Sequence, residues 1–211
     1  MKQTTPLYRD TIFKEINCPQ CGTLLPIRFR WSKLIECPSC HSSIFLEDEG
    51  AKLKGKSSTL SPEPSLVQLH EPLIIEGKNY LPLGKIRYSY GRGFWEEWFL
   101  QGANNREFWL SIDEGDFVLE HPIEMPLPFR DVGRLLVGDH YMGYQVTEKG
   151  KGECVGFSGE LPKVVTIGEV HRYLHLSKNG ASLITIEYDD DGIELFEGQW
   201  IDPFTIKRVQ A

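Results

Sequence analysis

Residues 18–22 read Cys-Pro-Gln-Cys-Gly and residues 37–41 read Cys-Pro-Ser-Cys-His, with fifteen residues between the two pairs of cysteines. Two C-x-x-C pairs at this separation are typical of zinc-binding ribbons. In each pair the proline favours a tight turn, and Gly22 suits the left-handed conformation expected after the second cysteine. We therefore predict that one structural Zn²⁺ per chain is bound by the four cysteines Cys18, Cys21, Cys37 and Cys40.

Histidine takes the place of glycine after the second pair, at position 41. Histidine is one of the few residues that tolerate a positive φ, so His41 fits the same turn, although it is also an alternative metal ligand. Four thiolates already complete a tetrahedron and leave no open position for water, so we expect a structural rather than a catalytic site. A ribbon of this size depends on its metal to fold.

Charge is divided unevenly along the chain. The first 60 residues carry a formal charge of +3 and the remainder −10, for a net charge of −7. An acidic C-terminal part disfavours contact with nucleic acid, whereas the ribbon alternates cations and aromatic residues in Arg-Phe-Arg-Trp-Ser-Lys at 28–33. That run is compatible with base stacking, or with a hairpin in which Phe29 and Trp31 point inward; the period of two makes the hairpin the simpler interpretation.

The composition also predicts the domain organisation. Residues 47–72 are rich in proline, serine and lysine and offer little apolar surface, so we expect a flexible linker there. It would separate a zinc ribbon at 1–46 from an all-β domain at 73–211. We find no apolar run long enough for a signal peptide or a membrane span, and we expect a cytoplasmic protein that reaches membranes only through partners.

The second domain is predicted to be all-β, barrel- or sandwich-like, because short apolar and aromatic runs recur every 10 to 12 residues between turn signals. The expected strands are residues 80–90, 94–100, 108–112, 117–120, 141–147, 170–176, 182–188 and 193–196. Residues 73–80 and 135–141 share an apolar triplet, a glycine turn and a tyrosine, so an internal duplication is an alternative to ordinary similarity between hairpins.

An ordered set of short motifs in this domain resembles the bacterial domain of unknown function 4178. The motifs are Gly-Lys-Ile-Arg-Tyr at 84–88, Trp-Glu-Glu-Trp-Phe-Leu at 95–100, Phe-Trp-Leu at 108–110 with Asp-Glu-Gly at 113–115, Leu-Leu-Val-Gly at 135–138, Gly-Glu-Leu-Pro at 159–162, and Ile-Glu-Tyr at 186–188 with Glu-Leu-Phe-Glu-Gly at 194–198. The resemblance covers about residues 70–207. It implies a domain often preceded by a zinc ribbon, and it implies no particular activity.

Three groups of residues in the second domain are candidates for chemistry. Cys154 is interpreted as a small buried apolar residue rather than a nucleophile. His171 and His175 lie four apart on one face, which allows a shared metal, but the alternation of residues 170–176 favours an edge strand with both histidines facing solvent. Glu96, Glu97 and Glu160 sit among aromatic residues; they are candidate acid/base groups, or they bind backbone amides or an arginine.

These observations favour a non-enzymatic adaptor in which the zinc ribbon helps to bind another protein. No nucleotide-binding loop, catalytic triad or open metal site is present among the motifs of the sequence. Two alternatives stay open: nucleic-acid binding through the basic and aromatic ribbon, and an enzyme that uses glutamates such as Glu97 and Glu160.

Overall fold

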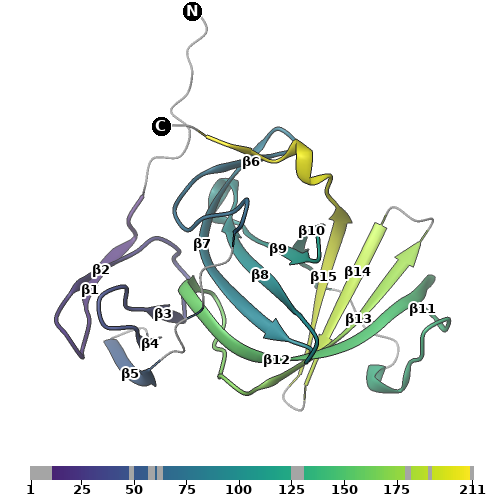
Figure 1. Cartoon of the computed structure of the whole chain (residues 1–211), viewed down its shortest axis with the longest axis horizontal. Helices are drawn as coiled ribbons and strands as arrows, with labels where there is room; N and C mark the ends of the chain where they lie inside the picture. Colours follow the sequence, from purple (N-terminus) through teal and green to yellow (C-terminus); the bar gives the residue numbers. More distant parts are fainter. Residues whose placement is uncertain are drawn as a thin grey trace, which may run out of the picture.

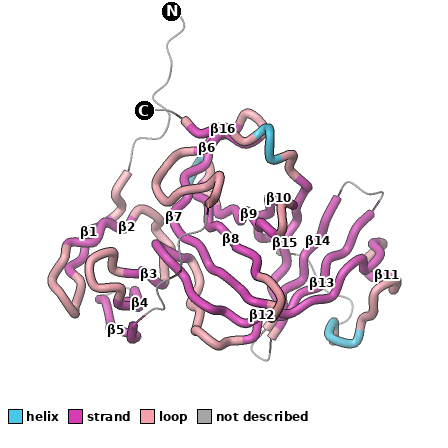
Figure 2. Tube along the Cα trace, in the orientation of Figure 1, coloured by secondary structure: helices cyan, strands magenta, loops and turns pink. Residues whose placement is uncertain are grey.

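The computed structural model describes residues 11–47, 50–56, 60, 64–124, 131–178, 182–189 and 192–209. Nearly all regular structure in these residues is β-strand, as Figure 2 shows. The helical elements found there are single 3₁₀ turns: η1 (Ala103–Asn105), η2 (Val132–Arg134) and η3 (Pro203–Thr205). Within the described ranges, no helix has the length and apolar composition needed to cross a membrane.

Eight antiparallel strands form a closed barrel (Figure 1), because β12 pairs with both β13 and β7 and so joins the two ends of the sheet. Around the ring the strands are β7 (Lys78–Ser89), β8 (Phe94–Gln101), β9 (Glu107–Asp113), β10 (Asp116–Pro122), β15 (Ile193–Trp200), β14 (Ser182–Tyr188), β13 (Val170–Lys178) and β12 (Tyr144–Leu161). Closure satisfies the hydrogen-bonding edges that an open sheet would expose. The predicted all-β domain is confirmed, in its barrel form.

Three short strands extend the ring. β6 (Leu73–Ile75) pairs with β7, β16 (Lys207–Arg208) pairs with β6, and β11 (His140–Tyr141) pairs with the start of β12. The internal duplication is not shown by this topology. The first of the two similar segments forms β6 and the start of β7, whereas the second runs through a loop into the two-residue strand β11.

The N-terminal part contributes one small sheet and three strands of the large one. β1 (Lys14–Asn17) and β2 (Leu24–Ile27) make a separate hairpin, while β3 (Leu34–Glu36), β4 (Ser42–Glu47) and β5 (Gly50–Lys56) follow one another at the end of the large sheet. β3 also pairs with the end of β12, so the long barrel strand continues into the ribbon, beside which it ends in Figure 1. Phe29 and Leu34 belong to the same buried cluster as the barrel residues Phe99 and Phe157. The ribbon therefore packs directly on the barrel.

The stretch 47–72, expected as a linker, contains a strand near its start and packed turns at its end. Gly50–Lys56 pairs with β4, Val67 is buried with Trp98 and its neighbours, and the His70 N–H donates to the carbonyl of Pro82 at 2.8 Å. Residues 48, 49, 57–59 and 61–63 lie outside the described residues. The domain boundary in this stretch stays a prediction.

The side chains of β8 point alternately into the barrel interior and toward the layer that covers its outside. Because successive side chains point to opposite faces of a strand, Trp95, Glu97 and Phe99 face the interior, whereas Trp98 and Leu100 pack under the outer layer that includes β6. Both faces are covered, so residues 95–101 are all buried. The interior is apolar around Phe99 and polar around Glu97, and the polar part forms the pocket described below.

Candidate metal centre and acidic pocket

The four predicted zinc ligands converge at one point of the ribbon. Sγ of Cys18 lies 3.7 Å from Sγ of Cys40, and Sγ of Cys21 lies 3.7 Å from Sγ of Cys37. Zn–S bonds of about 2.3 Å in a tetrahedron place neighbouring sulfur atoms about 3.8 Å apart. All four sulfur atoms lie within 4.8 Å of one another. The donor set and its spacing therefore fit a tetrahedral zinc ion.

Each C-P-x-C pair folds as a tight knuckle. The N–H of Gly22 donates to the carbonyl of Cys18 at 2.9 Å, and the N–H of His41 donates to the carbonyl of Cys37 at 2.8 Å. Gly22 has a φ of +77° and His41 a φ of +55°, as predicted for the residue after the second cysteine. His41 is not among the four clustered ligands, and its Nδ1 lies 2.8 Å from a carboxylate oxygen of Glu36.

Glu160 fastens the ribbon to the barrel. Glu160 lies next to the last residue of β12. Its carboxylate accepts hydrogen bonds from the backbone N–H groups of Arg28 and Phe29 and from the hydroxyl of Ser32. Burial raises the pKa of Glu160, although these donors oppose the shift. Of its two predicted roles, Glu160 therefore takes the structural one of binding backbone amides.

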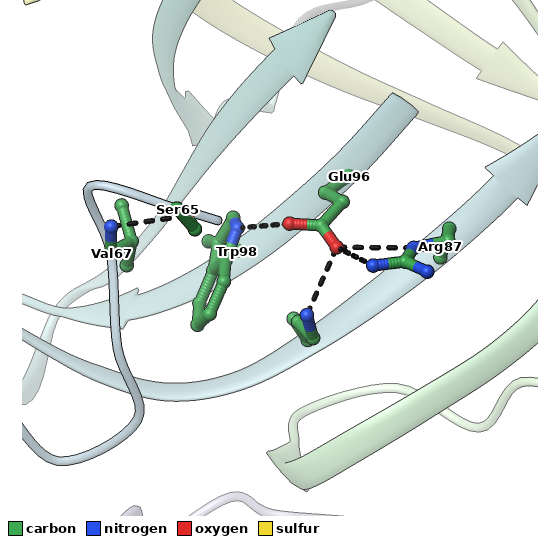
Figure 3. A network of polar contacts seen from close by, with 6 residues as sticks. Ser65, Val67, Arg87, Glu96 and Trp98 are labelled. Atoms are coloured by element: carbon green, nitrogen blue, oxygen red, sulfur yellow. Dashed lines mark hydrogen bonds and ion pairs between the residues drawn. The ribbon is translucent and has the colours of Figure 1, made fainter. Parts of the chain in front are cut away.

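Glu96 also has a structural role, on the outer face of β8. Its carboxylate accepts hydrogen bonds from Arg87 at 2.7 and 3.1 Å, from Lys85 at 2.9 Å and from the indole N–H of Trp98 at 3.0 Å (Figure 3). Burial disfavours its charge, but the bonds from Arg87 and Lys85 outweigh burial and lower the pKa of Glu96. The same view places Trp98 beside Ser65 and Val67, whose segment covers this face.

Glu97 differs from its neighbours because it points into the barrel. It lines a cavity of about 90 Å³ whose wall includes six carboxyl groups, and no described residue that lines this cavity is a lysine or arginine. The six are Glu97, Asp113, Asp116, Glu120, Glu148 and Glu187. A second cavity of about 410 Å³, lined by Lys163 and by the loops beside it, shares His171 and Glu187 with the first. Of the two glutamates that the enzyme hypothesis pairs, Glu97 and Glu160, only Glu97 lines this pocket.

Burial gives the carboxyl groups of the pocket different acidities. It raises the pKa of Glu97 to about 8, with help from the negative charges of Glu187 and Glu120, and it raises the pKa of Glu120 to about 7. Burial also disfavours the charge on Glu187, but the charges of Lys163 and His171 outweigh it and lower the pKa of Glu187. Lys163 Nζ lies 2.8 Å from Glu187 Oε2. At neutral pH a protonated carboxyl therefore stands beside an ionised one.

The prediction that His171 and His175 face solvent from an edge strand is wrong. β13 pairs with β12 on one side and β14 on the other, and its histidines point into the pocket. The His171 ring stacks on Tyr88 at 4.6 Å, and burial lowers the pKa of His171. For His175, burial is outweighed by its bond to Glu148, so the pKa of His175 is raised. The two histidines thus have separate partners rather than one shared metal.

Some pocket residues could not be identified from the sequence. Glu120 and Glu187 are each flanked by apolar residues that predict only a strand, and Lys163 lies outside every predicted strand. A charge at an inward position of an apolar strand is the signal that would have singled out Glu120 and Glu187. Cys154 is 1% exposed and packs with the apolar interior, as its interpretation required.

The two aromatic residues in the turn between β2 and β3 lie in different environments. Phe29 is buried against Phe99, but Trp31 is 56% exposed, so the prediction that both point inward is correct only for Phe29. Trp31 lines a groove of about 330 Å³ between the ribbon turn and barrel residues that include Arg106 and His121. The guanidinium of Arg30 lies over the Trp31 ring at 5.7 Å.

Comparison with known proteins agrees with the resemblance seen in the sequence. The family described as Domain of unknown function (DUF4178) matches residues 69–203, a range that contains all eight strands of the ring and excludes the cysteine quartet. No curated protein and no solved structure matches the chain.

Proposed function

The chain belongs to the DUF4178 family, and we propose that it acts as a non-enzymatic binding protein whose zinc ribbon and barrel together dock another protein. The observation that supports this proposal is the groove at the junction, which neither part forms alone. Phe29 and Trp31 provide its ribbon wall, and residues 104–107, 121 and 122 provide its barrel wall. A site shared by two modules gives a reason for fastening the ribbon through Glu160.

The chemistry of the groove favours an acidic segment with an aromatic or aliphatic side chain. Arg106 lines it, and Arg30 stacks on the exposed ring of Trp31 at its edge. The one carboxylate in the wall, Glu107, accepts a bond from the indole N–H of Trp109 at 2.7 Å. Exposed aromatic and arginine side chains are the residues that most often dominate protein-protein contacts.

Affinity capture from the native host tests this proposal. Wild-type protein and three variants are used as bait, and the bound proteins are quantified by mass spectrometry. The variants are Trp31→Ala, the double charge reversal Arg30→Glu with Arg106→Glu, and the control Lys151→Glu, which changes an exposed side chain on β12. We expect one protein retained by wild type and control, and depleted about tenfold or more by both groove variants. Equal capture by all four baits contradicts the proposal. Salt-sensitive retention on a polyanion column, lost with the arginine changes, would instead support nucleic-acid binding.

Catalysis in the acidic pocket is a second candidate function, and a specific observation favours it. Glu97 and Glu187 line the same pocket. Burial raises the pKa of Glu97 to about 8, whereas the charges of Lys163 and His171 outweigh burial and lower the pKa of Glu187, so the two carboxyl groups can act as general acid and general base. An enzyme of this kind would lose its cellular function with Glu97→Gln while keeping its fold. The adaptor would not.

A further inference from the structure

Three side chains from three strands of the barrel meet between its two cavities. Glu97 comes from β8, His171 from β13 and Glu187 from β14. One ligand atom from each, a carboxylate oxygen or a ring nitrogen, lies within 4.8 Å of the others. Residues so distant in the sequence converge here only because the barrel closes.

The separation of His171 and Glu187 is too long for a direct hydrogen bond and is suited to a shared ion, while the indole N–H of Trp95 donates to Glu97 Oε1 at 2.9 Å. His171 Nδ1 lies 3.8 Å from Glu187 Oε2, which is too long for a hydrogen bond. Two nitrogen or oxygen ligands held about 2.1 Å from one ion lie about 3.0 to 4.2 Å apart, depending on the coordination angle. The pair therefore has the separation of two ligands of one metal.

The His171 ring is fixed in place and has a nitrogen available. Tyr88 stacks on it at 4.6 Å and Trp95 lies 6.1 Å away, so its orientation is set by packing. In the described part of the chain, neither ring nitrogen of His171 makes a hydrogen bond; its polar contact is the 3.8 Å approach to Glu187. The His171 side chain is 13% exposed, and an imidazole so largely withdrawn from solvent normally finds a hydrogen-bonding partner or binds a metal.

The acidic lining of the pocket and the cavity that leads to it also favour a bound cation. Six carboxyl groups line the smaller cavity, and the ammonium group of Lys163 lies in the wall of the adjoining one. This excess of acidic over basic groups suits a cation. The 410 Å³ cavity, which shares His171 and Glu187, gives an ion a route to the ligands.

We propose that Glu97, His171 and Glu187 bind a divalent first-row transition-metal ion inside the barrel, separate from the zinc of the ribbon. The mixture of two carboxylates with one imidazole favours Mn²⁺, Fe²⁺, Co²⁺ or Zn²⁺ over the all-oxygen sites preferred by Ca²⁺ and Mg²⁺. This site is independent of the docking groove and does not require the adaptor proposal.

Lys163 is the competing cation. Its Nζ is 2.8 Å from Glu187 Oε2 and 3.9 Å from a carboxylate oxygen of Glu194. When an ion binds Glu187, Glu194 offers the ammonium group an alternative partner. The proposal therefore makes an unusual prediction: removing the lysine strengthens metal binding, although it breaks an ion pair.

The test is a Mn²⁺ titration of full-length protein whose ribbon is already loaded with Zn²⁺, followed by the loss of the free-ion signal in electron paramagnetic resonance. Mn²⁺ suits oxygen and imidazole ligands and does not compete for thiolates. We expect one Mn²⁺ per chain, with affinity reduced about tenfold or more in Glu97→Gln, Glu187→Gln and His171→Ala. Lys163→Met should bind Mn²⁺ more tightly than wild type. The matched control is Glu148→Gln, which removes a carboxylate of the same cavity that is already bonded to Tyr173 and His175, and it should bind as wild type does.

Three results overturn the proposal. One is the absence of stoichiometric Mn²⁺ binding to the wild-type chain, which needs no variant to fold. Another is an equal loss of affinity in Glu148→Gln and Glu97→Gln, because a diffuse acidic surface would respond to both. Weaker binding by Lys163→Met, in protein with a native near-ultraviolet circular dichroism spectrum, also contradicts it by making the Lys163–Glu187 pair purely structural.

Discussion

The carboxylate of Glu160, at the end of barrel strand β12, accepts a hydrogen bond from the backbone N–H of Phe29 in the ribbon turn. The same carboxylate binds the N–H of Arg28 at 2.9 Å and the hydroxyl of Ser32. Because all three donors lie in the turn that carries Trp31, this side chain anchors the ribbon wall of the groove to the barrel.

We predict that Glu160→Gln destabilises the protein by about 1 to 3 kcal/mol, because an amide cannot accept from all three donors and leaves buried N–H groups unpaired. Denaturant unfolding of the zinc-loaded chain measures the loss. The control is Glu153→Gln, an exposed glutamate on the same strand, which should stay within about 0.5 kcal/mol of wild type. Equal stability of the two variants would show that the hydrogen bonds to Glu160 contribute nothing to the free energy of unfolding.

Gly84→Ala should also loosen this junction. A Cβ on Gly84 in β7 would lie 2.2 Å from the backbone oxygen of Glu160, so one of the two strands must shift. We expect a cost of about 1 to 3 kcal/mol in the free energy of unfolding. Gly192→Ala is the matched control, since a Cβ there meets no atom within 4 Å and its φ is not in the left-handed region. A near-neutral Gly84→Ala would contradict the close packing of β7 against β12.

The acidic pocket predicts a dependence of stability on pH. Burial raises the pKa of Glu120 to about 7, against a Thr185 hydroxyl bond and the charges of His175 and Lys163, while Glu187 adds to the increase. A raised pKa contributes stability that is present below about pH 4.5 and lost as the pH rises through about 7. Between about pH 4.5 and 7, wild type should therefore lose up to about 1.4 kcal/mol per pH unit relative to Glu120→Gln, with little further change at higher pH. The bond from His175 lowers the pKa of Glu148. The stability of wild type relative to Glu148→Gln should therefore be lost as the pH falls through the acidic range, the opposite direction to Glu120. A flat difference between wild type and Glu120→Gln from pH 5 to 8 would contradict the burial of an ionisable Glu120.

The ribbon should hold one zinc per chain, measured by elemental analysis of freshly purified, unchelated protein, and Cys37→Ser should abolish it. Structural zinc is worth about 10 to 16 kcal/mol in small fingers, so loss of one thiolate unfolds a ribbon that has little core of its own. The barrel should keep its β-rich circular dichroism, because ring closure uses no ribbon strand. Cys154→Ala removes a cysteine buried in the barrel and should retain the zinc. A wild-type stoichiometry near zero contradicts the assignment.

The sequence predicts the ribbon in detail because thiolate spacing and knuckle turns are local properties. It also predicts strand content, since aromatic and β-branched runs end at glycine and asparagine turns. Ring closure is not predictable in this way, because the pairing of β12 with β7 depends on residues such as Phe157 and Ile86 that are far apart in the chain.

The pattern of residues in β13 shows why the sequence does not predict the pocket. Leu174 and Leu176 alternate with His175, and the period of two correctly separates the two faces of the strand. In most sheets the apolar face is the core and the polar face meets solvent. Here the leucines pack beneath an outer layer that includes Val132 and Tyr141, and the polar face lines the interior. The pattern identifies the faces but not what covers each one.

Complementation of a deletion strain tests the adaptor proposal most directly, with every variant first shown to be folded and zinc-loaded. We predict that Trp31→Ala and the Arg30→Glu, Arg106→Glu pair fail to restore whichever phenotype the deletion produces, whereas Lys151→Glu, Cys154→Ala and Glu97→Gln restore it. Full activity of both groove variants together with loss of function in Glu97→Gln would contradict the adaptor account and place the function inside the barrel.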